Sequence, residues 1–178
     1  MMRSTTESKR GISACVGAIA ITVLVWLGAC ALVDGVMMPT MSTSGMAAQA
    51  GFAAAGYQFF STFNQLELLA GAIALTGALA AWKHHIFRGG AAVWGLTLAS
   101  ILPIVAGVDT VLTPHISGLA LDLDMLPSTA NVAAPLSADM MLLQETYWGV
   151  EVVKLAIAVG LLVLCWKTTI QPSDRLTD

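Results

Sequence analysis

The chain has 178 residues, of which 57% are hydrophobic and 11% are charged, and its formal net charge is −3. Soluble domains carry about 25% charged residues, so this composition argues against a soluble protein and predicts one embedded in lipid. Phosphate binding needs clustered Lys and Arg, so a nucleic-acid partner is not expected.

Four apolar stretches follow one another along the chain, each close to the roughly 20 residues that a helix needs to cross a bilayer. The predicted spans are residues 11–36, 61–82, 90–112 and 147–166. They use nearly all of residues 1–178, so a single membrane domain is expected, with outer loops at 37–60 and 113–146. The predicted fold is all-α: a bundle of four transmembrane helices whose outer face carries a partly ordered loop cap.

The basic residues predict the orientation of this bundle. Outside the spans they are Arg3, Lys9, Arg10, Lys83, Arg88, Lys167 and Arg175, and neither outer loop contains one. Cytoplasmic loops of membrane proteins carry an excess of Lys and Arg, so both termini are expected in the cytoplasm, an N-in/C-in topology.

Turn-forming residues predict where the helices end. The first span is expected to end at Asp34-Gly35, and residues 46–60 suggest a helical extension that leads into the second span. Pro103 is expected to kink the third span, and Thr113-Pro114 to end it. The last helix is expected to run over residues 138–166, longer than the hydrocarbon core, so that it tilts or protrudes.

Polar residues inside and beside the spans form the first candidate site. The members of this predicted intramembrane cluster are Glu67, Glu151, Lys154, Asn64, Asp109 and Asp34, placed in the outer half of the spans. A buried charge must be paired or neutralised, so Lys154 is expected to contact Glu67 or Glu151. Two interpretations stay open: an ion pair that sets helix register, and a proton or cation site reached from outside.

Methionines and a histidine form the second candidate site, for a metal. Met38 and Met41 have a spacing suited to Cu(I), because thioethers are soft ligands, and His115 could join them. The simpler interpretation is that flexible Met side chains fill gaps at a loop-rich interface.

No catalytic site is predicted. The chain contains no P-loop, nucleophile elbow, zinc motif or dinucleotide fingerprint, so a non-enzymatic protein is expected, and no cofactor is indicated. The three cysteines lie inside the apolar spans and are interpreted as small buried hydrophobic residues: Cys15, Cys30 and Cys165.

The polar residues between the spans resemble a known group of proteins. The segments that carry this resemblance are Met37-Met38-Pro39-Thr40, Gly51-Phe52-Ala53-x-Ala55-Gly56-Tyr57, Phe63-Asn64-x-x-Glu67-Leu68-Leu69, Thr113-Pro114-His115-Ile116 and Tyr147-Trp148-x-x-Glu151-Val152-x-Lys154-Leu155. They are similar to small four-span membrane proteins of cyanobacteria in or near domain-of-unknown-function family 4149. The resemblance implies four retained spans in a bacterial plasma membrane or thylakoid membrane, and it implies no activity.

Three functions are compatible with these patterns. The first choice is a non-enzymatic integral membrane protein that packs against, assembles or stabilises a larger membrane complex, photosynthetic or respiratory, through a membrane-protein partner or self-association. The alternatives are a small transporter or ion- or proton-handling protein that uses the Glu/Lys cluster, and an extracytoplasmic Cu(I)-binding membrane protein. A transporter predicts a water-accessible cleft that reaches past Glu67, whereas a scaffold predicts that this region is closed.

Overall fold

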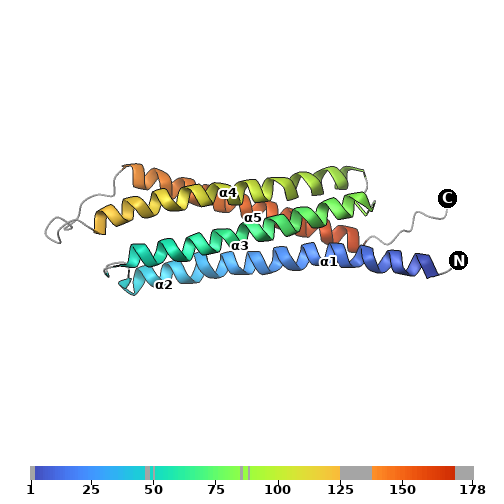
Figure 1. Ribbon diagram of the computed structural model, residues 1–178, viewed down its shortest axis with the longest axis horizontal. Helices are drawn as coiled ribbons and strands as arrows, with labels where there is room; N and C mark the ends of the chain where they lie inside the picture. Colours follow the sequence, from blue (N-terminus) through green and yellow to red (C-terminus); the bar gives the residue numbers. More distant parts are fainter. Residues whose placement is uncertain are drawn as a thin grey trace.

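The structure, a computed structural model, describes residues 3–46, 49, 51–84, 86–87, 89–124 and 138–170. Its elements in chain order are α1 (Arg3–Leu32), the π-helix η1 (Val33–Met37), α2 (Met38–Thr43), α3 (Phe52–Lys83), α4 (Gly90–Asp124) and α5 (Ala138–Ile170). The four long helices lie side by side along one axis (Figure 1). The all-helical architecture predicted from the sequence is therefore confirmed.

Four segments are long and apolar enough to cross a membrane. They are Cys15–Met41, Phe52–Lys83, Gly90–Gly118 and Met141–Thr169. Large apolar side chains such as Leu24, Leu69 and Ile104 point outward and are exposed. An apolar exterior of this kind suits contact with lipid chains.

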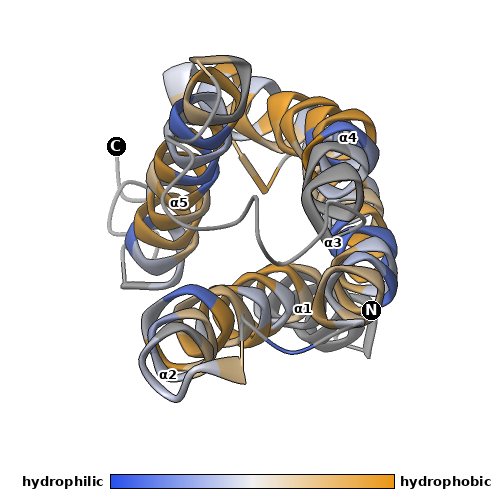
Figure 2. Ribbon diagram, turned by 90° about the vertical axis from the view of Figure 1, so that its left-hand side faces the viewer, coloured by the Kyte–Doolittle hydropathy of each residue, from blue (hydrophilic) through white to orange (hydrophobic). Residues whose placement is uncertain are grey.

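The long helices surround a common core. Helix α3 packs against α1 and α4, α4 also packs against α5, and α5 returns to α1. Figure 2 looks along the bundle and shows these helices arranged around its axis. The core consists mainly of small and branched apolar residues, and Ala74, Ala78 and Ala99 are completely buried in it.

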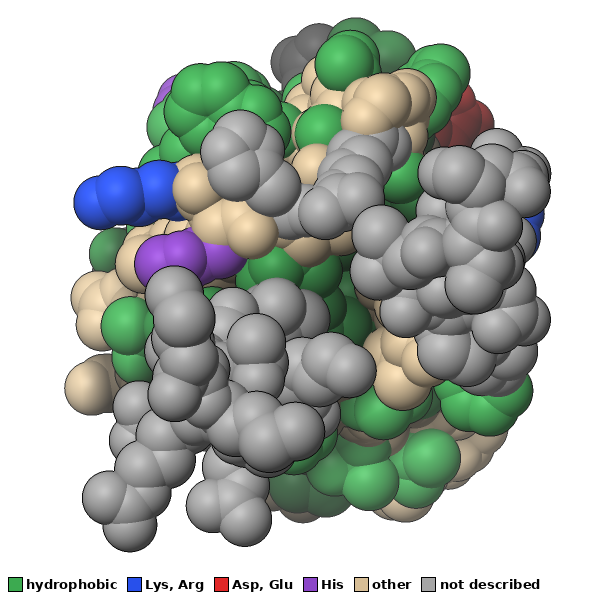
Figure 3. Space-filling view, turned by 90° about the vertical axis from the view of Figure 1, so that its right-hand side faces the viewer, with side chains coloured by type: hydrophobic (Ala, Val, Ile, Leu, Met, Phe, Trp, Pro, Cys, Tyr) green, Lys and Arg blue, Asp and Glu red, His purple; other side chains and the backbone are tan. Residues whose placement is uncertain are grey.

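Helix α1 begins and α5 ends at the same end of the bundle, which we call the terminal end; the opposite end, where α2 finishes and α3 begins, is the distal end (Figure 1). Figure 3 looks at the terminal end and shows His and Lys or Arg side chains gathered there. Lys83, His84 and Lys167 are exposed at this end. Among the residues described, the only other lysine outside the N-terminal part of α1 is Lys154, which is buried.

Small residues bring α3 and α4 close together. A Cβ added to Gly71 of α3 would stand 3.1 Å from the Cα of Pro103 in α4. Pro103 removes a backbone donor from α4, but it does not end the helix. Such close contacts between backbones are typical of helices that pack in membranes.

The helices that contain the first and third spans are longer than predicted, whereas α3 and α5 begin within the predicted helical stretches 46–60 and 138–166. The outer loops are correspondingly shorter. Asp34-Gly35 does not end the first helix, which continues as η1 and α2 to Thr43. Helix α3 begins at Phe52, and α4 continues past Pro114 to Asp124. Proline costs a helix one hydrogen bond without requiring it to stop. The predicted loop cap falls largely on residues 125–137, which lie outside the described residues.

Candidate functional site

A buried ammonium group lies at the centre of the bundle. The Nζ atom of Lys154 lies 2.8 Å from Glu67 Oε2, 2.6 Å from Asp109 Oδ2 and 2.6 Å from Glu151 Oε1. These groups come from α3, α4 and α5, and their exposed fractions are 1% for Lys154 and Glu67, 0% for Asp109 and 3% for Glu151. We call these four residues the Lys154 cluster.

The cluster joins residues that the sequence pattern placed on separate helices. The predicted ion pair of Lys154 is present with both Glu67 and Glu151, and Asp109 is a third carboxyl partner. Glu151 and Lys154 are three residues apart on α5 and therefore share a helix face. Glu67 and Lys154 lie near the midpoints of α3 and α5, and not in their outer parts, because both helices include distal residues that precede the predicted spans 61–82 and 147–166.

Helix α1 contributes two hydrogen-bond donors to the cluster. Trp26 Nε1 donates to Glu67 Oε1 at 3.1 Å, and the thiol of Cys30 donates to the same oxygen at 3.4 Å. Lys154 Nζ also donates to both oxygens of Glu67, at 3.0 and 2.8 Å. Every contact of the Glu67 carboxyl group is thus one in which it accepts, which is the role of an ionised carboxylate.

The other two carboxyl groups are less well satisfied. Asp109 Oδ1 and Glu151 Oε2 are buried and have no hydrogen-bond partner among the described residues. Asp109 Oδ2 lies close to Lys154 Nζ, but it is not aligned with it for a hydrogen bond. One ammonium group therefore faces three carboxyl groups, of which only Glu67 has a complete set of donors.

Asn64 and Thr113 lie beside the cluster. Asn64 Nδ2 donates to the backbone carbonyl of Asp109 at 3.0 Å and to Thr113 Oγ1 at 2.7 Å. Both side chains are buried. Asp34, the sixth predicted member, is only partly buried on η1 and has no hydrogen bond or ion pair with the described members of the cluster.

Part of the cluster has the spacing of a metal site. Ligand atoms of Cys30, Glu67 and Glu151 lie within 4.8 Å of one another. The ammonium group of Lys154, however, already contacts both carboxylates, and the Cys30 thiol donates a hydrogen bond to Glu67. To bind a metal, the Cys30 thiol would have to be deprotonated, and each carboxylate would need an electron pair that does not already accept from the ammonium group. The arrangement therefore suits protons better than a metal.

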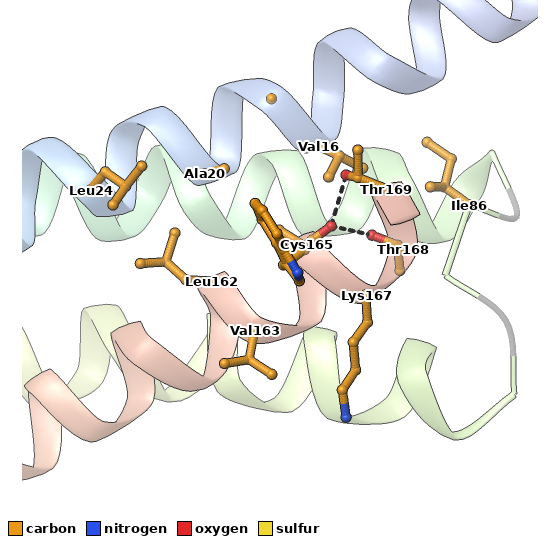
Figure 4. Close-up of a pocket in the computed structure, with 12 residues that line it drawn as sticks. Val16, Ala20, Leu24, Ile86, Leu162, Val163, Cys165, Lys167, Thr168 and Thr169 are labelled. Carbon is orange, nitrogen blue, oxygen red and sulfur yellow. Dashed lines mark hydrogen bonds between the residues drawn. The ribbon is translucent and has the colours of Figure 1, made fainter. Parts of the chain in front are cut away.

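Three of the cavities in the described part of the bundle bear on the candidate sites. The largest, about 780 Å³, lies between α1 and α5 towards the terminal end. Figure 4 shows Ala20 and Leu24 of α1 across from Leu162 of α5, and hydrogen bonds from Thr168 and Thr169 to the carbonyl of Cys165. Its walls are mostly apolar and do not include the Lys154 cluster.

The two smaller cavities lie in the distal half of the bundle. One, of about 350 Å³, is lined by Met38, Met41 and apolar or aromatic neighbours. The other, of about 120 Å³, lies between α3 and α4 and is lined mostly by polar side chains, including Asn64 and Thr113. None of the three cavities is lined by a member of the Lys154 cluster.

The structure brings together two of the three residues of the predicted copper site. Met38 and Met41 line one cavity, beside Phe52 and Phe59. His115 is exposed on α4, does not line that cavity, and bonds through Nδ1 to the carbonyl of Val111 at 2.7 Å. Copper binding stays a prediction.

Sequence reasoning missed three members of the polar network: Trp26, Cys30 and Thr113. The sequence contains a spacing that points to two of them: Trp26 and Cys30 are four residues apart and therefore share a helix face. Thr113 stands in the same relation to Asp109. The two α1 residues were interpreted as apolar, because their donor atoms are a small part of each side chain.

Comparison of the chain with protein-family models, with curated proteins and with solved structures finds no match. The resemblance to domain-of-unknown-function family 4149 therefore stays a prediction. The fold and the site define the class: a helical bundle with four helices long and apolar enough to cross a membrane, built around a buried charge cluster.

Proposed function

We propose that this protein is an integral membrane protein that binds protons at the Lys154 cluster, and so belongs to the small ion- and proton-handling proteins. The observation that supports this most strongly is the imbalance of the cluster. One buried ammonium group faces three buried carboxyl groups, and Asp109 and Glu151 each have an oxygen without a hydrogen-bond partner among the described residues. Ionisable groups inside membrane helices are rare and commonly mark ion pathways or proton relays.

Protons are the simplest way to balance this charge. A buried carboxyl group that is not fully paired neutralises itself by taking up a proton, and it then gains an O–H donor. None of these three cavities reaches the cluster, and a closed cluster is what the sequence pattern predicts for a scaffold and not for a transporter with a water-accessible cleft. A proton needs no such cleft, so a closed cluster is compatible with proton binding. Asp109 and Glu151 are the proposed proton carriers, whereas Glu67 is the proposed permanent counter-ion of Lys154.

The proposed orientation is N-in/C-in, in the plasma or thylakoid membrane of a bacterium. Lys83 and Lys167 lie exposed at the terminal end, and the segments that join the helices at the distal end contain no Lys or Arg. This asymmetry supports a cytoplasmic terminal end and an outward-facing distal end.

Infrared spectroscopy of the purified protein in lipid tests proton binding directly, because a protonated carboxyl group and a carboxylate absorb at different frequencies. At neutral pH we expect a protonated-carboxyl band that weakens in Asp109→Asn or in Glu151→Gln. The matched control is Glu145→Gln on α5, since Glu145 is exposed. If the wild-type protein has no such band, every carboxylate of the cluster is ionised and the proposed function is wrong.

Proton handling also predicts transport. In vesicles that contain a pH-sensitive dye, a potassium potential set with valinomycin should drive proton uptake through the wild-type protein. Asp109→Asn removes a proposed carrier and should reduce uptake to that of empty vesicles, whereas Glu145→Gln should not. Equal uptake by wild type and Asp109→Asn would restrict the cluster to a structural role.

A second candidate function is the packing or assembly of a larger membrane complex without enzymatic activity. The apolar cavity of about 780 Å³ between α1 and α5 favours it, because the chain itself leaves this seam incompletely filled (Figure 4). A photo-cross-linker at Leu24, which lines the seam, should then give one discrete product in the membrane. The same group at Leu69, an exposed residue of α3, is the control. Identical product patterns at the two positions would argue against a specific partner.

A further inference from the structure

A polar cavity lies between α3 and α4, on the distal side of the Lys154 cluster. It has a volume of about 120 Å³ and is lined by Tyr57, Ser61, Gln65 and Thr110, besides Asn64 and Thr113. Tyr57 and Gln65 are exposed, so the cavity opens to the surface, whereas Asn64 and Thr113 form its buried inner end. Its walls combine polar groups of these side chains with a larger apolar surface, and its volume is sufficient for a few water molecules.

The inner end of the cavity is linked to Asp109 through a hydrogen bond to its backbone. Asn64 Nδ2 donates both to Thr113 Oγ1 at 2.7 Å and to the Asp109 carbonyl at 3.0 Å. Thr113 is one helical turn from Asp109 on α4, so their side chains share a face. The Asp109 carboxyl group is completely buried, and its Oδ1 atom has no partner among the described residues.

Pro114 also lines this cavity. A proline within a helix removes the hydrogen bond to the carbonyl four residues earlier, which here belongs to Thr110. Helix α4 therefore lacks one backbone hydrogen bond beside the cavity, although it continues through Pro114.

We infer that this cavity is the route by which Asp109 exchanges a proton with the aqueous phase on the distal side, and that the Asn64–Thr113 hydrogen bond closes its inner end. The inference rests on the proposed function, because it assigns an access path to the same site. When the bond opens, the O–H bond of the Asp109 carboxylic acid breaks and its proton passes to water in the cavity. The carboxylate that remains faces the ammonium group of Lys154, with Glu67 and Glu151 on its other sides.

The route has a specific consequence for the rate of hydrogen–deuterium exchange at Asp109. The measurement follows the protonated-carboxyl infrared band after vesicles that contain the protein are mixed with D₂O. Gln65→Cys places a thiol on the cavity wall, where a charged, membrane-impermeant methanethiosulfonate reagent can block it. Thr62→Cys is the matched control, since Thr62 is exposed on the same helix and does not line the cavity.

Modification of Gln65→Cys should slow exchange roughly tenfold or more, equivalent to at least about 1.4 kcal/mol of added barrier. Modified Thr62→Cys and reagent-treated wild type, which retains its native cysteines, should exchange at the wild-type rate. Ser61→Phe fills the cavity without any labelling step and should slow exchange as well. Unchanged exchange in modified Gln65→Cys and in Ser61→Phe would overturn the route while leaving the proposed function in place.

The inner closure is tested by Thr113→Val, which keeps the shape of the side chain but removes the acceptor for Asn64. Loss of a hydrogen bond worth about 1 kcal/mol should speed exchange roughly fivefold. Slower or unchanged hydrogen–deuterium exchange in Thr113→Val would show that the Asn64–Thr113 hydrogen bond does not close the inner end of the cavity. Absence of the protonated-carboxyl band from the wild-type protein would instead refute the proposed function. Failure of the route and failure of the proposed function therefore give different spectra.

Discussion

The indole nitrogen of Trp26 in α1 and Oε1 of Glu67 in α3 lie 3.1 Å apart, and both side chains are buried. This hydrogen bond, with that of Cys30, connects α1 to the Lys154 cluster, whose members come from α3, α4 and α5. The cluster and its two α1 donors therefore involve all four long helices, and their geometry depends on how those helices are placed.

Trp26→Phe should destabilise the bundle, because it removes a donor from a buried carboxylate while keeping an aromatic ring. The expected loss is about 1–3 kcal/mol in the free energy of unfolding. Thermal unfolding in a mild detergent measures it. Trp94→Phe is the control, since Trp94 is 64% exposed on α4. Equal stability of the two variants would show that the Trp26–Glu67 bond contributes nothing.

The ion pairs of Lys154 predict a coupling between substitutions. Lys154→Ala should cost about 3–5 kcal/mol, because it leaves buried carboxylates without their partner. Adding Glu67→Gln should recover part of this loss, since it removes the carboxylate that Lys154 contacts through both oxygens. Denaturation of the two single variants and of the double variant gives the coupling energy.

Lys167→Ala is the control for that cycle, because Lys167 is exposed near the end of α5. It should change stability by less than about 0.5 kcal/mol. Losses that simply add in the double variant Lys154→Ala/Glu67→Gln would contradict the pairing.

The close approach of α3 and α4 predicts opposite effects for two glycine substitutions. Gly71→Ala places a Cβ 3.1 Å from the backbone of Pro103, so the helices must separate, at a cost of about 1–3 kcal/mol. Gly107→Ala in α4 meets no atom within 4 Å and should be neutral or stabilising by up to about 1 kcal/mol. Unfolding midpoints that rank the two variants the other way would rule out tight packing at Gly71.

Sequence periodicity and charge were sufficient to predict four long helices and most of the cluster. Hydrophobic length predicts helices, and charged residues among apolar ones must find partners, so a contact of Lys154 with an acidic residue followed from physical chemistry alone. The contact of Asp109 with Lys154 depends on the rotation of α4 about its axis. That rotation is set by packing contacts such as Gly71 on Pro103, which no local pattern specifies.

Two features were harder to predict from the sequence: where helices end, and which apolar side chains use a hydrogen-bond donor. Asp34-Gly35 and Pro114 are usual helix-ending signals, yet the helices continue through both. In an apolar environment a backbone that leaves the helix loses hydrogen bonds that water does not replace, so continuation is favoured over local preference. Trp26 and Cys30 count as apolar in any hydropathy pattern, and only the fold shows that their donors point at Glu67.

The proposed orientation predicts which surfaces accept an impermeant thiol reagent. Ser44→Cys at the distal end should be labelled in intact cells, because Ser44 is exposed and the segments joining the helices there lack Lys and Arg. His84→Cys at the terminal end should be labelled only after the membrane is permeabilised. The reverse pattern, or labelling of both positions in intact cells, would refute the N-in/C-in topology.

Glu67 is the proposed counter-ion and Asp109 a proposed proton carrier, so replacing each by its neutral amide should lower the free energy of unfolding by different amounts. Glu67 accepts hydrogen bonds from Trp26, Cys30 and Lys154, so Glu67→Gln replaces one acceptor oxygen by a donor group and should cost about 2–4 kcal/mol. Asp109 has an oxygen without a partner, and as a proposed proton carrier it is already neutral part of the time. Asp109→Asn should therefore cost less than about 1 kcal/mol in unfolding free energy, although it abolishes proton uptake.

This contrast separates a proton-carrying Asp109 from a purely structural one. If all three carboxyl groups were ionised to hold Lys154, Asp109→Asn would remove a charged contact of 2.6 Å and would be as destabilising as Glu67→Gln. Unfolding of both variants in the same detergent gives the comparison, and vesicle uptake gives the functional readout. A variant that keeps its stability and loses transport is the result expected of a residue that carries protons. Equal losses of stability in the two variants would instead favour a charge network whose role is to hold the four helices together.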